Sequence, residues 1–366
     1  MIKLDGSYLE GGGSIVRQAL ALSTITQKPF EVTNIRKGRK NPGLKNQHIH
    51  CVKALEKLCN AKTQGAYLAS TYLKYEPNKI ESKNLDIDIG TSGSITLLLQ
   101  SILIPAVFAD KPSKITIIGG TEGKFAQPFD YFKEVFLPQL KRFADIDVKL
   151  IKRGYYPKGN GKIELKINQK YCLSDFKNFE DFQKNLKENA PKINLTQQHN
   201  LIQIKGISHA SFDLQKASVA ERQAKTAELI LKNKYNCPIQ IEIEYSRTLS
   251  LGSGITLWAI FSKNKEEIDI NNPIRLGADS LGERGKKAEI VGQEAAFNLI
   301  KEIESKAPID KYLADQVLPF MALTSKSKIK TSKITSHCKT NIYVIEQFLG
   351  KTFEIDEKEN IIFTIN

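Results

Sequence analysis

The chain has 366 residues, a formal net charge of +14, and 41% hydrophobic against 26% charged residues. This length favours two or more domains, and the composition excludes wholesale disorder. The sequence contains no apolar run of about 18 residues and no apolar segment near its first residue, so we expect no membrane partner and no secretory signal. Its five scattered cysteines form no CxxC pair, which argues against a disulfide framework and a structural zinc site. They favour a reducing compartment, the cytoplasm or, in a eukaryote, the nucleus. The positive charge by itself has two explanations of about equal weight, a nucleic-acid partner or a drift in composition toward lysine.

The first elements along the chain alternate between helix and strand. Residues 14–26 have the periodicity of a helix and follow a Gly-rich loop, and residues 30–35 resemble a short strand. A second helix is predicted over 47–61 and a further strand over 67–77.

This order of elements recurs twice more along the chain. The second occurrence comprises a strand, a helix, a strand, a helix and a strand pair, predicted over 85–90, 95–109, 115–120, 128–143 and 147–167. The third comprises a helix, a strand, a helix and two strands, predicted over 311–323, 327–335, 340–349, 352–356 and 361–365. We therefore predict an α+β fold of three repeated βαβαββ-like units, each with two helices on a four-stranded sheet. Alternating lysines in the strand at 327–335 are typical of an edge strand.

The second and third units are separated by about 135 residues that carry elements of their own. These are helices predicted over 217–232 and 286–304 and strands over 201–208, 239–245 and 255–261, enough for a small α+β domain. The charged stretch 176–192 is interpreted as the linker into it. The predicted division is a large three-unit body, residues 1–185 and 307–366, and an inserted domain, residues 186–306.

The Gly-rich loop before the first helix is a candidate anion site. Glu10 is followed by three glycines and Ser14, and Arg17 lies one helical turn further on. Glycines let backbone N–H groups approach an anion, and a helix N-terminus adds partial positive charge. A carboxylate beside phosphate requires a divalent cation between them, so Glu10 is a candidate metal ligand if a nucleotide binds here. For the loop taken alone, a plain strand-to-helix turn is the favoured interpretation.

Two other basic motifs lie near the start of the chain. The KxDG sequence at Lys3 matches the lysine-adenylylation motif of ligases, but we interpret it as a coincidence because four residues are a permissive pattern. The loop 34–45 carries Arg36 and Arg39, whose guanidinium groups suit bidentate phosphate contacts, and Gln47 and His48 begin the next helix. A solvated basic loop is the alternative interpretation.

The third unit contains a candidate nucleophile. His337 precedes a helix that Thr340 would cap, and a helix N-terminus favours the neutral, nucleophilic form of imidazole. Upstream, Tyr312 and Asp315 share one helix face beside Gln316, offering a ring for stacking and an acceptor for a ribose hydroxyl. A structural histidine and an ordinary surface acid remain the alternatives for these positions.

Six segments, which occur in one order along the chain, resemble a known family. They are DGSYLEGGGSIVRQALALS, NIRKGRKNPGLKNQH, GTSGSITLLLQ, RGYYPKGNGKI, YLADQVLPFMAL and SHCKTNIYVIEQFL. Together they resemble the RNA 3'-terminal phosphate cyclases, over about residues 5–349 and more thinly in the insert. In one segment the family's Gly-Gly-Gly is replaced by Gly159-Asn160-Gly161, and Asn tolerates the positive φ that such a turn requires.

The resemblance implies an ATP-dependent ligase in RNA processing, which converts an RNA 3'-phosphate into a 2',3'-cyclic phosphodiester and releases AMP and pyrophosphate. It implies an enzyme-adenylate on His337 and a divalent cation, Mg²⁺ or Mn²⁺, on Glu10. The nucleotide contacts of the family fall on Gln100, Pro128, Tyr312, Asp315 and Gln316, and its phosphate-binding positions on Arg17, Arg36, Arg39, Gln47 and His48. Pro128 and Tyr312 are expected to flank the adenine.

Two alternatives are weighed against this function. A non-catalytic relative that acts as a scaffold in ribosome assembly is expected to lose the nucleophile, whereas His337 is present here. The enolpyruvyl transferases are built from similar units, but they form no enzyme-adenylate and have no evident use for the insert.

Overall fold

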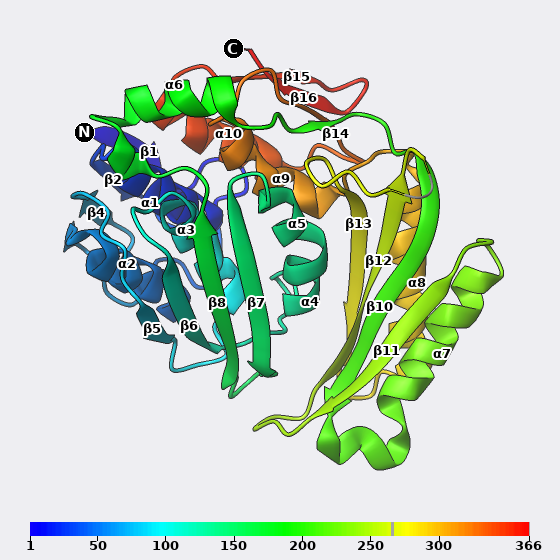
Figure 1. Cartoon of the computed structure of the whole chain (residues 1–366). Helices are drawn as coiled ribbons and strands as arrows, with labels where there is room; N and C mark the ends of the chain where they lie inside the picture. The colour runs from blue at the N-terminus through cyan, green and yellow to red at the C-terminus, as the bar shows by residue number, and fades with distance from the viewer. Residues whose placement is uncertain (265–266, 366) are drawn as a thin grey trace.

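The computed structural model describes residues 1–264 and 267–365, and it confirms the α+β class. The described residues form four sheets, each of four strands and each mixing parallel with antiparallel pairs. Figure 1 shows how these sheets and the helices are arranged. The first sheet has the order β1-β2-β4-β3, from strands β1 (Ile2–Asp5), β2 (Phe30–Thr33), β3 (Lys62–Gln64) and β4 (Leu73–Glu76), with helices α1 (Ser14–Thr26) and α2 (Asn46–Cys59). The strand predicted over 67–77 is therefore too long, because only residues 73–76 pair.

The second sheet has the order β5-β6-β8-β7. Its strands are β5 (Leu85–Asp88), β6 (Ser113–Gly119), β7 (Ala144–Lys152) and β8 (Gly161–Gln169), and it is accompanied by helix α3 (Ile95–Val107). The single helix predicted over 128–143 is wrong in detail: the segment divides into α4 (Phe129–Tyr131), a π-helical turn η1 (Phe132–Phe136) and α5 (Leu137–Leu140). Asn160, between β7 and β8, has a φ of 59°, so the expected positive-φ turn is confirmed.

The third sheet has the order β15-β16-β14-β9 and draws on residues more than 130 positions apart. Its strands are β9 (Asn194–Leu195), β14 (Lys328–Lys330), β15 (Phe353–Asp356) and β16 (Ile361–Thr364), with helices α9 (Lys311–Met321) and α10 (Ser336–Leu349). The expectation of a lysine-protected edge strand is wrong, since β14 lies between β16 and β9. In each of these three sheets one outer pair is parallel, namely β1–β2, β5–β6 and β9–β14, and the other pairs are antiparallel.

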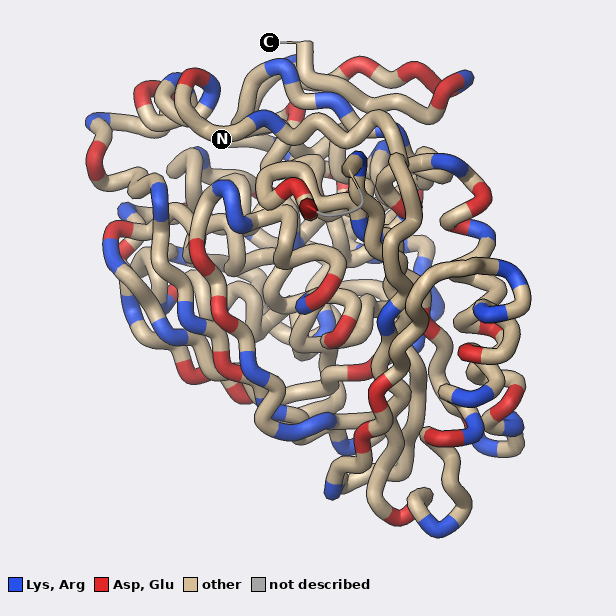
Figure 2. The backbone as a smooth tube through the Cα atoms, turned by 45° about the vertical axis from the view of Figure 1, so that its right-hand side comes forward, with Lys and Arg blue, Asp and Glu red and all other residues tan. Residues whose placement is uncertain are grey.

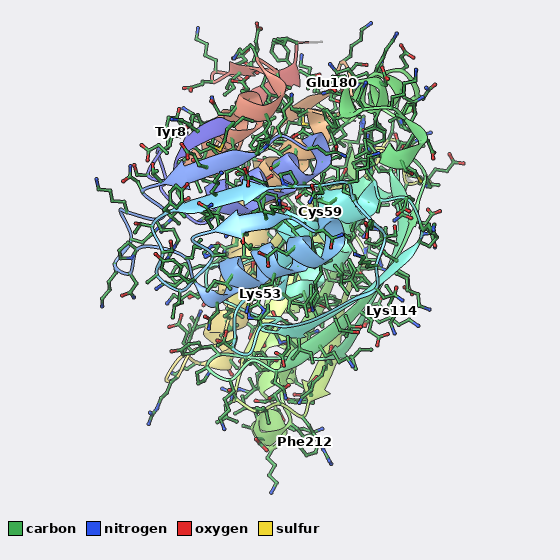
Figure 3. All side chains as sticks on the ribbon, turned by 90° about the vertical axis from the view of Figure 1, so that its left-hand side faces the viewer. Tyr8, Lys53, Cys59, Lys114, Glu180 and Phe212 are labelled. Carbon is green, nitrogen blue, oxygen red and sulfur yellow. The ribbon has the colours of Figure 1, made fainter. Side chains whose placement is uncertain are left out.

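The fourth sheet, on the right in Figure 1, has the order β11-β10-β12-β13. It comprises β10 (Asn200–Ser211), β11 (Ile239–Ser246), β12 (Ser253–Ser262) and β13 (Ile274–Leu281), with α7 (Val219–Lys232) and α8 (Ala288–Glu304) packed side by side on one face. A short helix, η3 (Phe212–Ala217), follows β10. Figure 3 shows Phe212 at the lower tip of the molecule, far from Tyr8 of the Gly-rich loop. The predicted domain boundaries stay a prediction.

The stretch predicted to be a linker is a helix. Residues 171–176 include the short turn η2 (Leu173–Asp175), and α6 (Phe179–Asn189) follows, capped by the Asn178 side chain. Its apolar residues Phe179, Phe182 and Leu186 fall on one face and are buried, which is why a charged sequence still forms a packed helix.

Helix α1 is the element that positions the candidate site. All of its residues are buried, and it packs against α2, α3 and α10. Its only charged residue is Arg17, and its remaining surface is apolar or small all round, the pattern of a central helix. The interior of the molecule is thus organised around a helix that carries one buried cation.

Candidate functional site

The N-termini of several helices meet beside the Gly-rich loop. The side chain of Gln47 at the start of α2 accepts a hydrogen bond from the backbone N–H of Ser94, the N-cap of α3, at 3.3 Å. Gly13, the N-cap of α1, lies against the ring of His48 in the first turn of α2. His337, in the first turn of α10, lies 3.6 Å from Glu10 of the loop. Converging helix N-termini direct partial positive charge and free N–H groups toward one place, which is a ready site for an anion.

Two glycines of the loop lie close to functional side chains, and at Gly13 the neighbour is a buried ring that cannot easily move. A Cβ placed on Gly13 would lie 2.2 Å from His48 Nε2 and 2.8 Å from Arg17 Nη1. A Cβ on Gly12 would lie 2.2 Å from Glu10 Oε2. The run of glycines therefore makes room for three functional side chains beside the start of α1, an explanation that a plain turn does not supply.

Arg17 is buried in the middle of this site. Its Nε donates to Gln100 Oε1 on α3 at 2.9 Å, and its Nη1 lies 3.5 Å from His48 Nε2. Burial lowers the pKa of Arg17 to about 10, and this effect is partly offset by Asp315. The guanidinium thus remains charged at neutral pH although its environment opposes the charge.

His48 faces Arg17 as a second donor. Its Nδ1 accepts the backbone N–H of Lys45 at 2.9 Å, and burial, with the positive charge of Arg17, lowers its pKa well below the usual value. A neutral ring whose Nδ1 accepts carries its proton on Nε2. Two donors, one from each side chain, therefore point into the same small space, and an anionic oxygen is the group that both of them can bind.

His337 lies at the opening of the site, with 51% of its side chain exposed. Burial lowers its pKa below 6.5, and Arg17 and Arg39 lower it further, so the ring is mainly neutral at pH 7. The expectation that Thr340 caps this helix is wrong. Helix α10 begins earlier, at Ser336, and its cap is Thr335, whose hydroxyl accepts from the Cys338 backbone N–H at 3.3 Å.

The two arginines of the loop 34–45 differ in their contacts. The Arg36 guanidinium donates to the carbonyls of Asn41 and Gly43, at 2.8 and 2.9 Å, and so holds its own loop. The Arg39 guanidinium reaches back to form an ion pair with Glu10 Oε1. Of the two, only Arg39 is joined directly to the Gly-rich loop.

Four further predicted site residues lie on α9 or just before α4. Tyr312 is half-exposed in the first turn of α9, and the Gln316 amide donates to its carbonyl at 2.9 Å. Burial raises the pKa of Asp315 to about 7, and the Asp315 carbonyl accepts from Asn341 on α10 at 2.9 Å. Pro128 precedes α4, and Tyr131 of that helix donates to Asp310, the N-cap of α9, at 2.7 Å. The starts of α4 and α9 are thereby held together.

Glu10 fits the role of a metal ligand, but only as a single one. Its Oε2 is buried and has no hydrogen-bond partner among the described residues, so one oxygen is free to bind a cation. The group of three possible ligands that the described residues form lies elsewhere, at Glu122, Asp130 and His209. A Mg²⁺ ion at Glu10 would need phosphate oxygens and water for its remaining positions, which is how proteins commonly bind this ion.

Sequence reasoning missed two polar side chains beside these residues. Both amide atoms of Gln127, next to Pro128, are buried and lack partners among the described residues, and so does Asn341 Oδ1. No periodicity or motif distinguishes a lone Gln or Asn, so neither residue could be found from its pattern. A cavity of about 620 Å³ lies elsewhere, beside β9 and β12, and none of the predicted site residues lines it.

The surface charge does not mark the site. Figure 2 shows Lys and Arg interspersed with Asp and Glu along most of the chain, not gathered on one face in this view. None of the helices in the described part of the chain is long and apolar enough to cross a membrane.

Comparison with known proteins identifies the family. The RNA 3'-terminal phosphate cyclase family matches residues 8–355. An RNA 3'-terminal phosphate cyclase of Pyrococcus abyssi is 42% identical over 357 residues, which are 97% of this chain and 95% of the relative. The cyclase of Methanosarcina acetivorans is 41% identical in an alignment of 370 positions that covers 99% of this chain and 98% of the relative. That of Archaeoglobus fulgidus is 39% identical in an alignment of 364 positions that covers 99% of this chain and 100% of the relative. The chain therefore belongs to the RNA 3'-terminal phosphate cyclase family of enzymes.

Proposed function

We propose that this protein cyclises the 3'-terminal phosphate of RNA to a 2',3'-cyclic phosphodiester, at the expense of ATP and through a histidine–AMP intermediate on His337. The observation that carries the proposal is the position of His337. A neutral, half-exposed imidazole lies in the first turn of α10, 3.6 Å from Glu10 and near enough to the buried Arg17 for that guanidinium to lower its pKa. This is a nucleophile next to an anion site.

The first step joins His337 to AMP. Nδ1 of the ring faces the carboxylate of Glu10, which favours the tautomer with its proton on Nδ1 and leaves the Nε2 lone pair free. Nε2 attacks the α-phosphorus of ATP, forming a P–N bond while the P–O bond to pyrophosphate breaks. The depressed pKa of His337 keeps the lone pair available at neutral pH.

The buried donors bind the phosphates. Arg17 Nη1 and His48 Nε2 face each other 3.5 Å apart and would both donate to phosphate oxygens, while Gln100 fixes the guanidinium from behind. Arg39 supplies a second guanidinium once its contact with Glu10 is exchanged for one with phosphate. A divalent cation held by Glu10 would neutralise charge on the departing pyrophosphate.

The nucleoside would lie along α9. Tyr312 presents an exposed ring to the adenine, and Pro128 would cover the other side. Asp315 would accept a ribose hydroxyl, and Gln316 has a buried amide oxygen, Oε1, without a partner among the described residues.

The remaining steps consume the adenylate. An oxygen of the RNA 3'-phosphate attacks the phosphorus of histidine–AMP, so that a P–O bond forms and the P–N bond breaks. The vicinal O2' then attacks the RNA phosphorus, the cyclic ester forms, and AMP leaves. This last step is intramolecular, so proximity supplies much of its rate.

We propose in addition that the first three sheets repeat one βαβαββ unit. Each has one parallel and two antiparallel pairs in the same spatial order, and each carries two helical segments. The fourth sheet, between β9 and α9, would be the insertion into the third unit.

Incubation with α-labelled ATP and Mg²⁺ tests the proposed chemistry. We expect acid-labile label on the wild-type chain and none on His337→Asn, with both proteins giving the same circular dichroism spectrum. Lys3→Ala should be labelled normally, since Lys3 belongs to the KxDG motif at the exposed start of β1. Label that persists in His337→Asn would contradict the proposal. Absence of label in the folded wild type would favour a non-catalytic RNA-processing scaffold.

A further inference from the structure

A second cluster of charged side chains is buried between the second and fourth sheets. Arg153, which follows β7 and has no exposed side-chain surface, forms ion pairs with Glu122 at 2.7 Å, Asp130 at 2.9 Å and Glu244 of β11 at 2.8 Å. Three carboxylates share one guanidinium. If all are ionised, the cluster carries two more negative charges than Arg153 neutralises. Glu244 is 36% exposed, but Glu122 and Asp130 are buried, and an excess of negative charge there is costly without a further cation.

Two atoms of this cluster lack hydrogen-bond partners among the described residues. They are Glu122 Oε2 and His209 Nε2, of residues that are 3% and 1% exposed, and they lie 3.6 Å apart. Asp130 directs its Oδ2 to Arg153, and one ligand atom from each of Asp130, Glu122 and His209 lies within 4.8 Å of the others. Buried polar atoms without partners are uncommon in native proteins, and here two of them face each other beside a third possible ligand.

The geometry of the three atoms suits a metal ion. Glu122 Oε2 and His209 Nε2 are 3.6 Å apart, close to the roughly 3.4 Å expected between two ligands that each bind a tetrahedral ion at about 2.1 Å. The other ring nitrogen of His209, Nδ1, lies 2.7 Å from the Tyr155 hydroxyl. A metal-bound histidine commonly donates its other N–H to such a partner, which fixes the tautomer that leaves Nε2 free for the ion.

We propose that Glu122, Asp130 and His209 bind a divalent transition-metal ion of the Zn²⁺ type, at a site separate from Glu10. One imidazole and two carboxylates are ligands that zinc accepts, whereas Mg²⁺ prefers oxygen alone. The two positive charges would balance the two left over from the carboxylates that surround Arg153. Asp130 has lone pairs enough to serve both Arg153 and the ion.

Such an ion would fasten one loop to the fourth sheet. Glu122 and Asp130 bracket residues 123–129, whereas His209 belongs to β10. The ion would therefore hold both ends of this loop against a strand from another part of the chain. Its role is structural, and it does not depend on the proposed chemistry at His337.

Zinc binding to the untagged, full-length chain tests the proposal directly. After chelation and removal of the chelator, we expect the wild type to bind one tight equivalent of Zn²⁺ and to melt at a higher temperature with the ion than without it. Co²⁺ in place of Zn²⁺ should give the absorption bands of a four- or five-coordinate site. Amide exchange over residues 123–129 should slow at least tenfold when Zn²⁺ is bound.

Variants distinguish this site from other histidines and from Glu10. His209→Asn and Glu122→Gln should weaken Zn²⁺ binding at least 100-fold and lose the thermal shift. The matched variant His199→Asn, at an exposed position, and Glu10→Gln should keep both. If the folded wild type binds no tight equivalent, or if His209→Asn and Glu122→Gln bind it as well as the wild type does, the site does not exist and the cluster is neutralised by protons instead.

Discussion

Replacing Arg17 by methionine tests whether the charge of this residue serves phosphate binding or the stability of the fold. Burial lowers the pKa of Arg17 from its ordinary value to about 10, which corresponds to about 3.4 kcal/mol against the charged form. Arg17→Met removes this penalty. It also leaves Gln100 Oε1 without its donor, which costs about 1–3 kcal/mol. The ligand-free variant should therefore be as stable as the wild type or more stable by up to about 2 kcal/mol.

Arg142 provides the matched control. Burial also lowers its pKa to about 10, but its donors all serve the fold, reaching the main-chain carbonyls of Gln139, Pro191 and Asn271. Arg142→Met leaves three carbonyls without donors, at about 2 kcal/mol each or about 6 kcal/mol together, against about 3.4 kcal/mol of relief from burial. We expect this variant to lose about 2–3 kcal/mol.

Equilibrium urea unfolding of both variants, with adenylylation by α-labelled ATP, measures the contrast. Arg17→Met should keep its unfolding midpoint and lose at least 100-fold in labelling rate, because a buried donor to the phosphates is gone. ATP should no longer raise its midpoint. If Arg17→Met is destabilised as much as Arg142→Met, or is labelled at the wild-type rate, then Arg17 is a structural residue and the reasoning is wrong.

Three further predictions concern the loop and the nucleophile. Gly13→Ala places its Cβ 2.2 Å from His48 Nε2, so the labelling rate should fall at least tenfold. The control Gly38→Ala, whose Cβ meets nothing within 4 Å, should be labelled normally. Equal rates in the two variants would contradict the close approach. Thr335→Ala removes the cap of α10, so it should lower the free energy of unfolding in urea by about 1 kcal/mol and slow the labelling. Thr340→Val should lower the free energy of unfolding less, because the Thr340 hydroxyl has no partner among the described residues. Because burial, with Arg17 and Arg39, lowers the pKa of His337 below its usual value, the ring is mainly neutral at pH 7 and gains its proton only in more acidic solution. The labelling rate should therefore change little between pH 8 and 7 and fall in more acidic solution, and a half-maximal rate at pH 7 or above would refute the assignment.

Long periodic elements were predictable because their pattern extends over several turns. Helix α1 begins and ends at the predicted residues 14 and 26, and the strand pair β7–β8 falls within two or three residues of the expected bounds. Asn160 adopts the positive φ that its place in a Gly-rich turn suggested. In each case the physical signal is local, so a single sequence contains it.

Other elements depend on contacts that no local pattern reveals. Strand β9 has only two residues, too few for an alternation to be recognised, yet it pairs with β14 and moves that strand from the edge to the interior of its sheet. Helix α6 was taken for a linker because its charged residues outnumber its apolar ones, although Phe179, Phe182 and Leu186 form a buried face. The true cap of α10 was ambiguous, since Thr335 and Thr340 are both capping residues and only the backbone decides between them.

The candidate site was predicted by residue type and family resemblance, but its physical character was not. The sequence places Glu10 and Arg17 in one segment and His48 in another, and says nothing of their burial. In the structure Arg17 and His48 direct donors at each other, and Glu10 keeps one buried oxygen without a partner among the described residues. The Glu122–Asp130–His209 cluster was missed altogether, because its members are up to 87 positions apart and belong to no motif.

Both clusters have hydrogen-bonding capacity that the fold does not use. A stable interior satisfies most of its polar atoms, so two buried donors that face each other, or a buried carboxylate oxygen without a donor, are arrangements that folding alone does not favour. Arg17 and His48 face each other as donors, which an anion between them would satisfy. Glu122 Oε2 lacks a donor among the described residues, and the three carboxylates around Arg153 exceed its single charge, which a cation would satisfy. The missing partner therefore differs in sign between the two clusters, and one ligand cannot account for both. We expect phosphate beside α1 and, separately, a metal ion between β10 and the loop that carries Pro128.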